Sequence, residues 1–116
     1  MRKRGSIWLA NLNPGRGTEP GKVRPVLIVQ CQALLDAEHP SSLVVPLTSH
    51  LIEDAEPLRL RITAQSGLDK ESDLLLDQLR AIDNKQLIQG PLLQCTSEFM
   101  RRVDQALIEV LDIQSV

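Results

Sequence analysis

The stretch Val23-Arg-Pro-Val-Leu-Ile-Val-Gln30 decides the fold of this chain. Val26 to Val29 is a run of branched apolar residues, which suits a strand buried on both faces. Pro25 stands at the start of the run, where a missing backbone N–H is tolerated. We therefore predict a strand over residues 23–31, with Arg24 at its beginning.

Further short strands are predicted on both sides of this one. Residues 6–12 form a short apolar strand, and residues 13–21 form a long loop with two prolines and three glycines. Residues 43–47 and 73–82 are also strand-like, and residues 58–63 alternate apolar and polar side chains. That alternation predicts one wet face carrying Arg59 and Arg61 on the same side.

The end of the chain has helical signals. Residues 83–86 fit a capping box that opens a short helical turn. Thr96 or Ser97 can cap a longer helix, in which apolar residues recur at helical spacing: Phe99, Val103, Ala106, Leu107, Val110 and Leu111. Five or more short strands followed by an amphipathic C-terminal helix predict the α+β class, with a small barrel or half-barrel in a single domain over residues 1–116.

Bulk composition limits the possible functions. The chain has 116 residues, the size of one domain, and no apolar run near the roughly 20 residues of a membrane helix. No unbroken apolar segment follows the basic start, so we expect no signal peptide, no membrane partner and a cytoplasmic location. Two cysteines are too few for a disulfide scaffold, and we expect Cys31, at the end of a strand, to be a buried thiol.

The charge is unevenly distributed. The net charge is −2, but residues 1–24 carry six basic side chains and one acidic side chain, and the rest carries seven basic and fourteen acidic ones. An anion-binding face built from the N-terminal part is therefore possible in a protein that is acidic overall. A basic N-terminal segment that is merely solvated explains the charge equally well.

Standard catalytic and metal-binding motifs are absent. The sequence has no glycine-rich phosphate loop, no HExxH, no CxxC and no spacing that identifies a Ser-His-Asp triad, so we expect no metal and no cofactor. The two histidines are His39 and His50, and for both a solvated surface position is favoured over a catalytic role. His50 is the more interesting of the two, because it follows Thr48 by two residues. Trp8 lies inside an apolar strand, which favours a core or dimer-interface role over base stacking.

Five segments in register carry a resemblance over about residues 4–112. They are Arg4-Gly-Ser-Ile-Trp-Leu-Ala-Asn-Leu-Asn-Pro, Gly17-Thr-Glu-Pro-Gly, Val23-Arg-Pro-Val-Leu-Ile-Val-Gln, Val44-Val-Pro-Leu-Thr-Ser and Leu76-Asp-Gln-Leu-Arg-Ala-Ile-Asp. Together they resemble the MazF/PemK family of toxins. The chain departs from that pattern at Ser6, where many relatives have an acidic residue, and at Pro20 in the loop.

The resemblance implies a CcdB/PemK-like toxin fold, which is a small SH3-like β-barrel, working as a homodimer. It implies a sequence-specific, metal-independent endoribonuclease that cleaves single-stranded RNA, an mRNA interferase. The 2′-hydroxyl would attack the phosphate, leaving a 2′,3′-cyclic phosphate and a 5′-hydroxyl. It also implies a cognate antitoxin protein that neutralises the toxin.

Two residues match the catalytic positions of the family. Arg24 matches its catalytic arginine, and a guanidinium can bind two phosphate oxygens at once. Thr48 matches its catalytic threonine, whose hydroxyl can donate to a phosphate oxygen, although a strand-end hydroxyl that satisfies a turn is the alternative. We expect Arg24 to act by its charge, because guanidinium stays protonated in proteins.

Four further residues are expected to bind RNA or support the site. Glu19 matches a glutamate that the family retains, and it could orient Arg24, contact a base edge or be a plain loop carboxylate. Gln78 matches the glutamine of the Asp-Gln step, and its amide could read a base or hold the loop. Lys22 and Arg16 are assigned to phosphate contact from charge and loop position alone.

Two other classes of function compete with RNA cleavage. One is a non-enzymatic toxin of the same fold that binds and poisons a DNA topoisomerase, and the other is a nucleic-acid-binding module without activity. The pairing of Arg24 with Thr48 favours cleavage, because a binder has no need for that pair.

Overall fold

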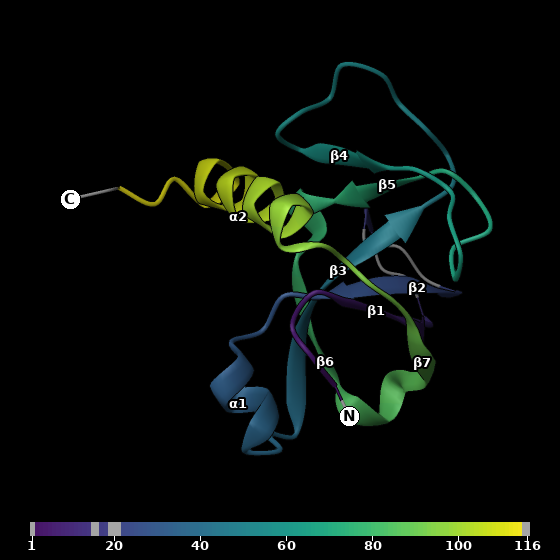
Figure 1. The fold of residues 1–116 in the computed structure, drawn as a ribbon, viewed down its shortest axis with the longest axis vertical. Coiled ribbons are helices and arrows are strands. Elements are labelled where there is room, and N and C mark those ends of the chain that lie inside the picture. The colour runs from purple at the N-terminus through teal and green to yellow at the C-terminus, as the bar shows by residue number, and fades with distance from the viewer. Residues whose placement is uncertain (1, 15–16, 19–21, 115–116) are drawn as a thin grey trace.

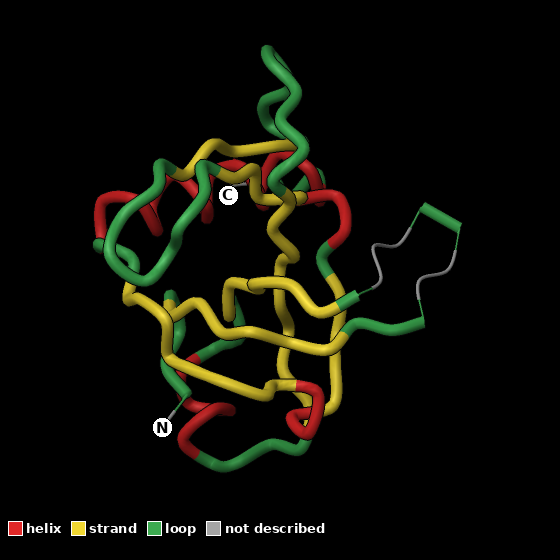
Figure 2. The backbone as a smooth tube through the Cα atoms, turned by 90° about the vertical axis from the view of Figure 1, so that its right-hand side faces the viewer, coloured by secondary structure: helices red, strands yellow, loops and turns green. Residues whose placement is uncertain are grey.

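The protein is described by a computed structural model covering residues 2–14, 17–18 and 22–114. Strands form the middle of the molecule and helices lie around them, as Figures 1 and 2 show. The elements in chain order are β1 (Ser6–Asn11), β2 (Val23–Ile28), α1 (Gln32–Asp36), β3 (Ser41–Thr48), β4 (Arg59–Ile62), β5 (Ser72–Leu75), η1 (Leu76–Gln78), β6 (Arg80–Asp83), η2 (Asn84–Gln86), β7 (Leu87–Gln94) and α2 (Ser97–Leu111).

The strands form one antiparallel sheet in the order β4-β5-β3-β2-β1-β7. Strand β6 pairs with the first half of β3, and β5 pairs with its end. The α+β class with a C-terminal helix is confirmed. Within the described residues β4 and β7 are the ends of the sheet and are not paired with each other, so a closed barrel is not confirmed.

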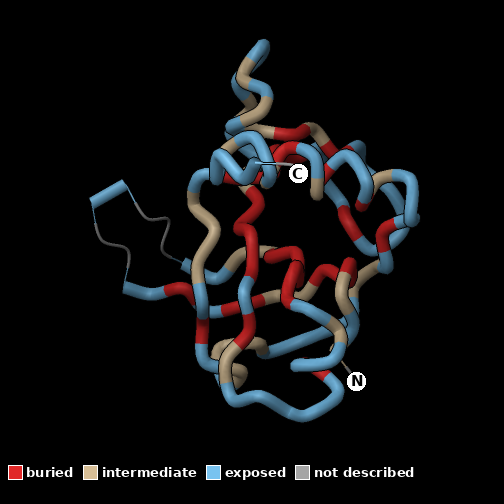
Figure 3. Tube along the Cα trace, turned by 90° about the vertical axis from the view of Figure 1, so that its left-hand side faces the viewer, coloured by how far each residue is buried: buried red, intermediate tan, exposed pale blue. Residues whose placement is uncertain are grey.

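The core has two parts, which draw their residues from opposite faces of the central strands. Figure 3 shows the buried stretches of the backbone mostly in the interior of the molecule, with exposed loops outside. One part joins β4, β5 and α2 to the central strands through Leu27, Leu47, Leu74 and Val103, and the other packs Val26, Ile28, Val44 and Ile82 around α1. Because successive strand residues point to opposite faces, β2 serves both parts at once. This explains why the apolar run of β2 is unbroken and predicted so clearly.

The helical signals near the end of the chain are confirmed. Thr96 caps α2 by accepting the Phe99 N–H at 3.1 Å. The capping box over residues 83–86 is present and opens η2, where the Asp83 side chain accepts the Lys85 N–H at 2.8 Å. None of the described helices is long and apolar enough to cross a membrane.

Several expectations from the sequence were wrong. Residues 73–82 are not one strand, because η1 separates β5 from β6 and lets the two strands pair with different parts of β3. Strand β2 ends at Ile28, earlier than predicted, and Cys31 is exposed at the start of α1 and not buried. Two elements, α1 and β7, were not predicted.

Trp8 packs against the second part of the core and is half-buried. Its Nε1 donates to the Ser6 Oγ at 3.1 Å, so the polar end of the indole is satisfied. Gly90 lies directly beneath the ring, where an added Cβ would come within 2.5 Å of the indole. These contacts support the predicted core role of Trp8.

Gly67, between β4 and β5, should tolerate no side chain. Its φ is +94°, and an added Cβ would lie 1.9 Å from the Leu92 carbonyl oxygen. We expect Gly67→Ala to lower the free energy of unfolding by about 2 kcal/mol, through backbone strain and this clash. Gly17→Ala is the control, because its φ is also positive, at +55°, but no atom of the described residues lies within 4 Å of an added Cβ. Equal losses for both variants in urea unfolding would contradict the role of the clash.

Candidate active site

Arg24 and Thr48 lie at adjoining ends of two neighbouring strands. Val26 of β2 pairs with Pro46 of β3, and the same register continued by two residues sets Arg24 across from Thr48. The Arg24 Nη1 donates to the Leu47 carbonyl at 3.2 Å, which ties the arginine to β3. The residue before a proline favours an extended backbone, and Pro25 follows Arg24 directly.

A groove of about 600 Å³ contains both residues. Its walls come from the start of β2, the end of β3, the segment before β5 and strand β7. The polar and charged residues that line it are Lys22, Arg24, Thr48, Ser49, His50, Asp69, Lys70, Ser72 and Gln89. Three cations against one carboxylate among these residues make the groove suited to an anionic ligand.

Arg24 is partly buried, which sets its electrostatic behaviour. Burial lowers the pKa of the Arg24 guanidinium from its ordinary value. An arginine stays protonated in proteins, so the side chain keeps its charge. A fixed charge away from bulk water acts more strongly on a bound anion than a solvated one.

Thr48 has one hydrogen bond that orients its hydroxyl. Its Oγ1 accepts the backbone N–H of His50 at 3.1 Å. With one lone pair used in this way, the hydroxyl proton remains available to donate to a ligand. The turn-satisfying role and the functional role are therefore compatible in the same side chain.

A cluster of charged residues holds the turn after Thr48. Asp73 of β5, which pairs with Thr48, is 1% exposed and accepts the Ile52 N–H at 3.0 Å, Arg59 at 3.1 Å and Arg61 at 2.6 Å. Burial alone would raise the pKa of the Asp73 carboxyl, but these hydrogen bonds outweigh burial and hold the pKa below its usual value. The hydrogen bond to Asp73 is in turn the largest cause that raises the pKa of Arg61.

Arg59 and Arg61 share a face of β4 as predicted, and that face is partly exposed, whereas Leu60 and Ile62 on the other face are buried. Both side chains are less than a third exposed, at 18% and 29%. Arg61 pairs with Asp73 across the two strands, which places the carboxylate between the two arginines. They are structural partners of Asp73 and lie outside the groove of Arg24.

The four residues predicted to bind RNA or support the site have different outcomes. Lys22 is exposed and lines the groove, and its N–H donates to Asn13 Oδ1 at 2.6 Å. Gln78 does not line the groove, and its Nε2 lies 3.5 Å from Thr18 Oγ1, at the long limit of a hydrogen bond. Glu19 and Arg16 lie outside the described residues.

Sequence reasoning missed several groove residues. His50, Lys70 and Gln89 line the groove with Arg24, although they come from the segments after β3 and before β5 and from β7. No strand periodicity extends through the first two segments, and β7 was not predicted. His39 is exposed as expected, and it does not line the groove.

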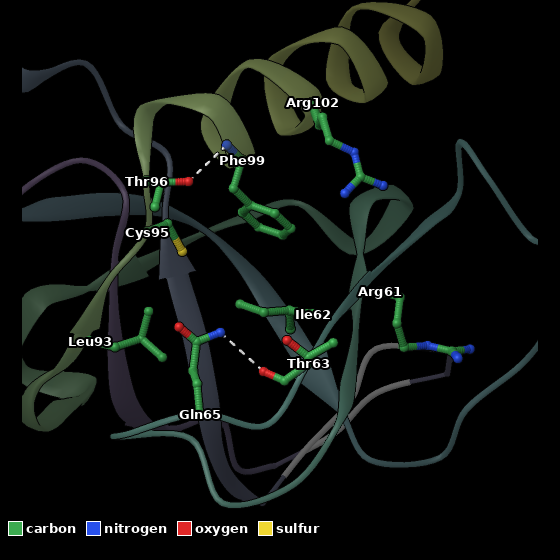
Figure 4. A pocket seen from close by; sticks show the side chains of 9 residues that line it. All are labelled: Arg61, Ile62, Thr63, Gln65, Leu93, Cys95, Thr96, Phe99 and Arg102. Carbon is green, nitrogen blue, oxygen red and sulfur yellow. Dashed lines mark hydrogen bonds between the residues drawn. The ribbon is translucent and has the colours of Figure 1, made fainter.

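A second, smaller hollow of about 230 Å³ lies between the end of β4 and the start of α2 (Figure 4). The Phe99 ring points into it, and Arg102 lies 5.8 Å from the centre of that ring. Cys95 lies on its wall, and burial raises the pKa of this thiol to about 11, which makes it a poor nucleophile.

No group of three or more His, Cys, Asp or Glu side chains in the described parts of the chain could hold a metal. The groove of Arg24 is therefore the better candidate for chemistry.

Comparison with known proteins finds relatives by sequence and by structure. The chain is 35% identical over 106 residues to endoribonuclease EndoA of Bacillus subtilis (strain 168), covering 90% of each protein. The structure resembles MazF of Deinococcus radiodurans with a TM-score of 0.79 at 21% identity, covering 97% of both chains. It also resembles Mycobacterium tuberculosis toxin MazF-mt6, with a TM-score of 0.77 at 20% identity over 95% of this chain and 99% of the other. Residues 3–111 match the family described as PemK-like, MazF-like toxin of type II toxin-antitoxin system, and the chain belongs to that family.

Proposed function

We propose that this toxin is an endoribonuclease that cuts single-stranded RNA at particular sequences. The observation that carries the proposal is the meeting of Arg24 and Thr48 in one cationic groove. The EndoA relative, an endoribonuclease by name, supports RNA cleavage at 35% identity over nine-tenths of the chain. Single-stranded RNA suits an open groove, because its unpaired bases can be splayed along the wall while cations hold the backbone.

The proposed reaction uses a nucleophile that the substrate carries. The 2′-hydroxyl beside the scissile phosphate attacks phosphorus, and the bond from phosphorus to the 5′-oxygen breaks. The products are a 2′,3′-cyclic phosphate and a 5′-hydroxyl. Arg24 stabilises the negative charge that gathers on the phosphorane oxygens, and the Thr48 hydroxyl donates to one of them.

The competing proposal, a topoisomerase poison of the same fold, explains less. A poison acts through a protein-binding surface and does not require a partly buried cation beside a hydroxyl. In the groove, Arg24 and Thr48 come together from two strands. The similarity to endoribonuclease EndoA also supports cleavage.

The decisive experiment offers the purified toxin a mixed-sequence RNA and a DNA of the same sequence, with and without EDTA. We expect cuts at a few defined RNA sites, equal with and without EDTA, and no cuts in DNA. A single 2′-deoxy nucleotide at a cleavage site should block that cut, because the nucleophile is gone. Absence of RNA cleavage would refute the proposed function, and loss of cleavage in EDTA would refute its metal independence.

We also propose that the toxin is a homodimer with a CcdB/PemK-like, SH3-like barrel, neutralised by a cognate antitoxin. A related endoribonuclease from Mycobacterial species is described in complex with its cognate antitoxin, with a TM-score of 0.76 at 19% identity. The close approach of Gly67 to Leu92 supports the barrel, because it brings the β4–β5 segment against β7. The groove is open to solvent, and a two-fold partner could extend its walls. A strict monomer by light scattering at micromolar concentration would contradict the dimer.

A further inference from the structure

His50 follows the end of β3 and lines the same groove as Arg24 and Thr48. We infer that His50 accepts the proton from the attacking 2′-hydroxyl, an assignment that rests on the proposed RNA cleavage. The chemistry outlined above needs such an acceptor, because the hydroxyl must lose its proton as its oxygen bonds to phosphorus.

The backbone of His50 is held on both sides of its Cα. Its N–H donates to Thr48 Oγ1 at 3.1 Å, and its carbonyl accepts from Arg59 Nη1 at 2.8 Å. Arg59 is itself fixed to the buried Asp73 at 3.1 Å. The position of His50 at the groove is therefore set by main-chain contacts that any residue could make.

The imidazole of His50 is not used in these contacts. The residue is exposed, and its ring makes no hydrogen bond to any part of the chain that the structure describes. A fixed backbone with an uncommitted ring beside a cationic groove suits a group that works on a ligand.

The other charged groups of the groove are poor proton acceptors at neutral pH. Lys22 and Lys70 are ammonium groups and Arg24 is a guanidinium, so all three carry their protons already. Asp69 is a carboxylate, and carboxylates are weak bases at neutral pH. Imidazole is the side chain that exchanges protons between about pH 5 and 8. Among the described residues of the groove, His50 is therefore best suited to accept a proton.

The proposed step balances without another reactant besides water. A neutral imidazole nitrogen of His50 takes the proton as the 2′-oxygen forms its bond to phosphorus. The bond from phosphorus to the 5′-oxygen breaks with its electron pair on oxygen, and that oxygen takes a proton from water. The imidazolium then returns its proton to water, and nothing is oxidised or reduced.

The chain offers a matched control in its second histidine. His39 is also exposed, but it lies before β3, where its carbonyl accepts from Asn84 Nδ2 at 2.7 Å, and it does not line the groove. His39→Gln removes the same imidazole from a place outside the site. It should leave both the rate and its pH dependence unchanged.

The test measures single-turnover cleavage of a defined RNA from pH 5 to pH 9. We expect the rate of the native toxin to fall on the acid side of the profile. We expect His50→Gln to lower the rate at neutral pH about a hundredfold and to remove this acid-side fall. We expect added imidazole to restore part of the activity of His50→Ala, in proportion to its neutral form. Substrate affinity should change little in both variants.

Other results would contradict either the role of His50 or the proposed function itself. A His50→Gln variant with the native rate and pH profile overturns the assignment while leaving RNA cleavage intact. Loss of the alkaline side of the profile instead of the acid side would make His50 a proton donor and also overturn it. A His50→Ala variant that loses RNA affinity and is not rescued by imidazole would show a binding role only. A native toxin that cuts no RNA refutes the proposed function itself, and with it this step.

Discussion

Arg24→Ala is expected to lower the rate of RNA cleavage by about a thousandfold, while the protein remains folded. Loss of a single oriented donor to a developing oxyanion costs roughly 10²–10³ in rate in other enzymes. Arg24 also supplies a full charge from a partly buried position, so we expect the upper end of that range. Single-turnover cleavage of a defined RNA measures the loss.

The other cations of the groove should not replace Arg24. Lys22 is exposed, and Lys70 is exposed on the opposite segment, so water screens both charges. A lysine ammonium also lacks the planar fork that holds two phosphate oxygens together. Arg101→Ala is the matched control, because Arg101 is an exposed arginine of α2 outside the groove, and it should leave the rate unchanged.

Arg24→Lys separates an electrostatic role from proton transfer. We expect it to keep a small residual activity and to leave the shape of the pH–rate profile unchanged, because neither residue changes its charge near neutral pH. Loss of one side of the profile in Arg24→Lys would contradict the electrostatic role. Read together with His50→Gln, the two profiles assign charge stabilisation and proton transfer to different residues.

The sequence predicted the central strands well, because burial on both faces leaves a plain signal. Strand β7 was missed since Gly90-Pro91 interrupts its apolar residues in the manner of a turn, and the space beneath Trp8 that requires Gly90 appears only in three dimensions. The short helix α1 was missed because Cys31, its N-cap, makes no side-chain capping bond. Local patterns cannot show such tertiary contacts.

In the site, too, some features follow from sequence patterns and others depend on how the strands pair. Arg24 and Thr48 were paired through a family resemblance, and the register of β2 and β3 gives the physical reason that they lie side by side. The alternation of β4 placed Arg59 and Arg61 on one side correctly, but it did not show that the neighbouring strand brings Asp73 to that face and leaves both arginines only partly exposed. Strand pairing is set by long-range topology, which one strand's own pattern does not contain.

Asp73→Ala is expected to lower the free energy of unfolding by about 3 kcal/mol, since removing one partner of a buried ion pair leaves the other charges poorly compensated. Asp73 is 1% exposed and bonds to Arg59, Arg61 and the Ile52 N–H. Urea unfolding measures this loss. Glu71→Gln is the control, because Glu71 pairs with Arg61 at 3.5 Å from a position that is 46% exposed, where an ion pair is worth at most about 1 kcal/mol.

Asp73 should also make the fold sensitive to acid. Its pKa is lower in the folded protein than the ordinary value of about 4, so its stabilisation is complete above that value and disappears as the pH falls through the folded pKa. Asp73→Asn keeps the shape without the charge, and its stability should therefore fall less steeply below about pH 4 than that of the native protein. Parallel acid-unfolding curves for the two proteins would contradict this contribution.

The activity of the Asp73 variants connects the buried cluster to the groove. Asp73 holds Ile52 directly and His50 through Arg59, so its loss frees the turn that follows Thr48. We expect Asp73→Ala to reduce cleavage well below the fraction of protein that is folded, whereas Glu71→Gln should cleave like the native toxin. Activity that simply tracks the folded fraction would mean that Asp73 stabilises the fold without positioning the site.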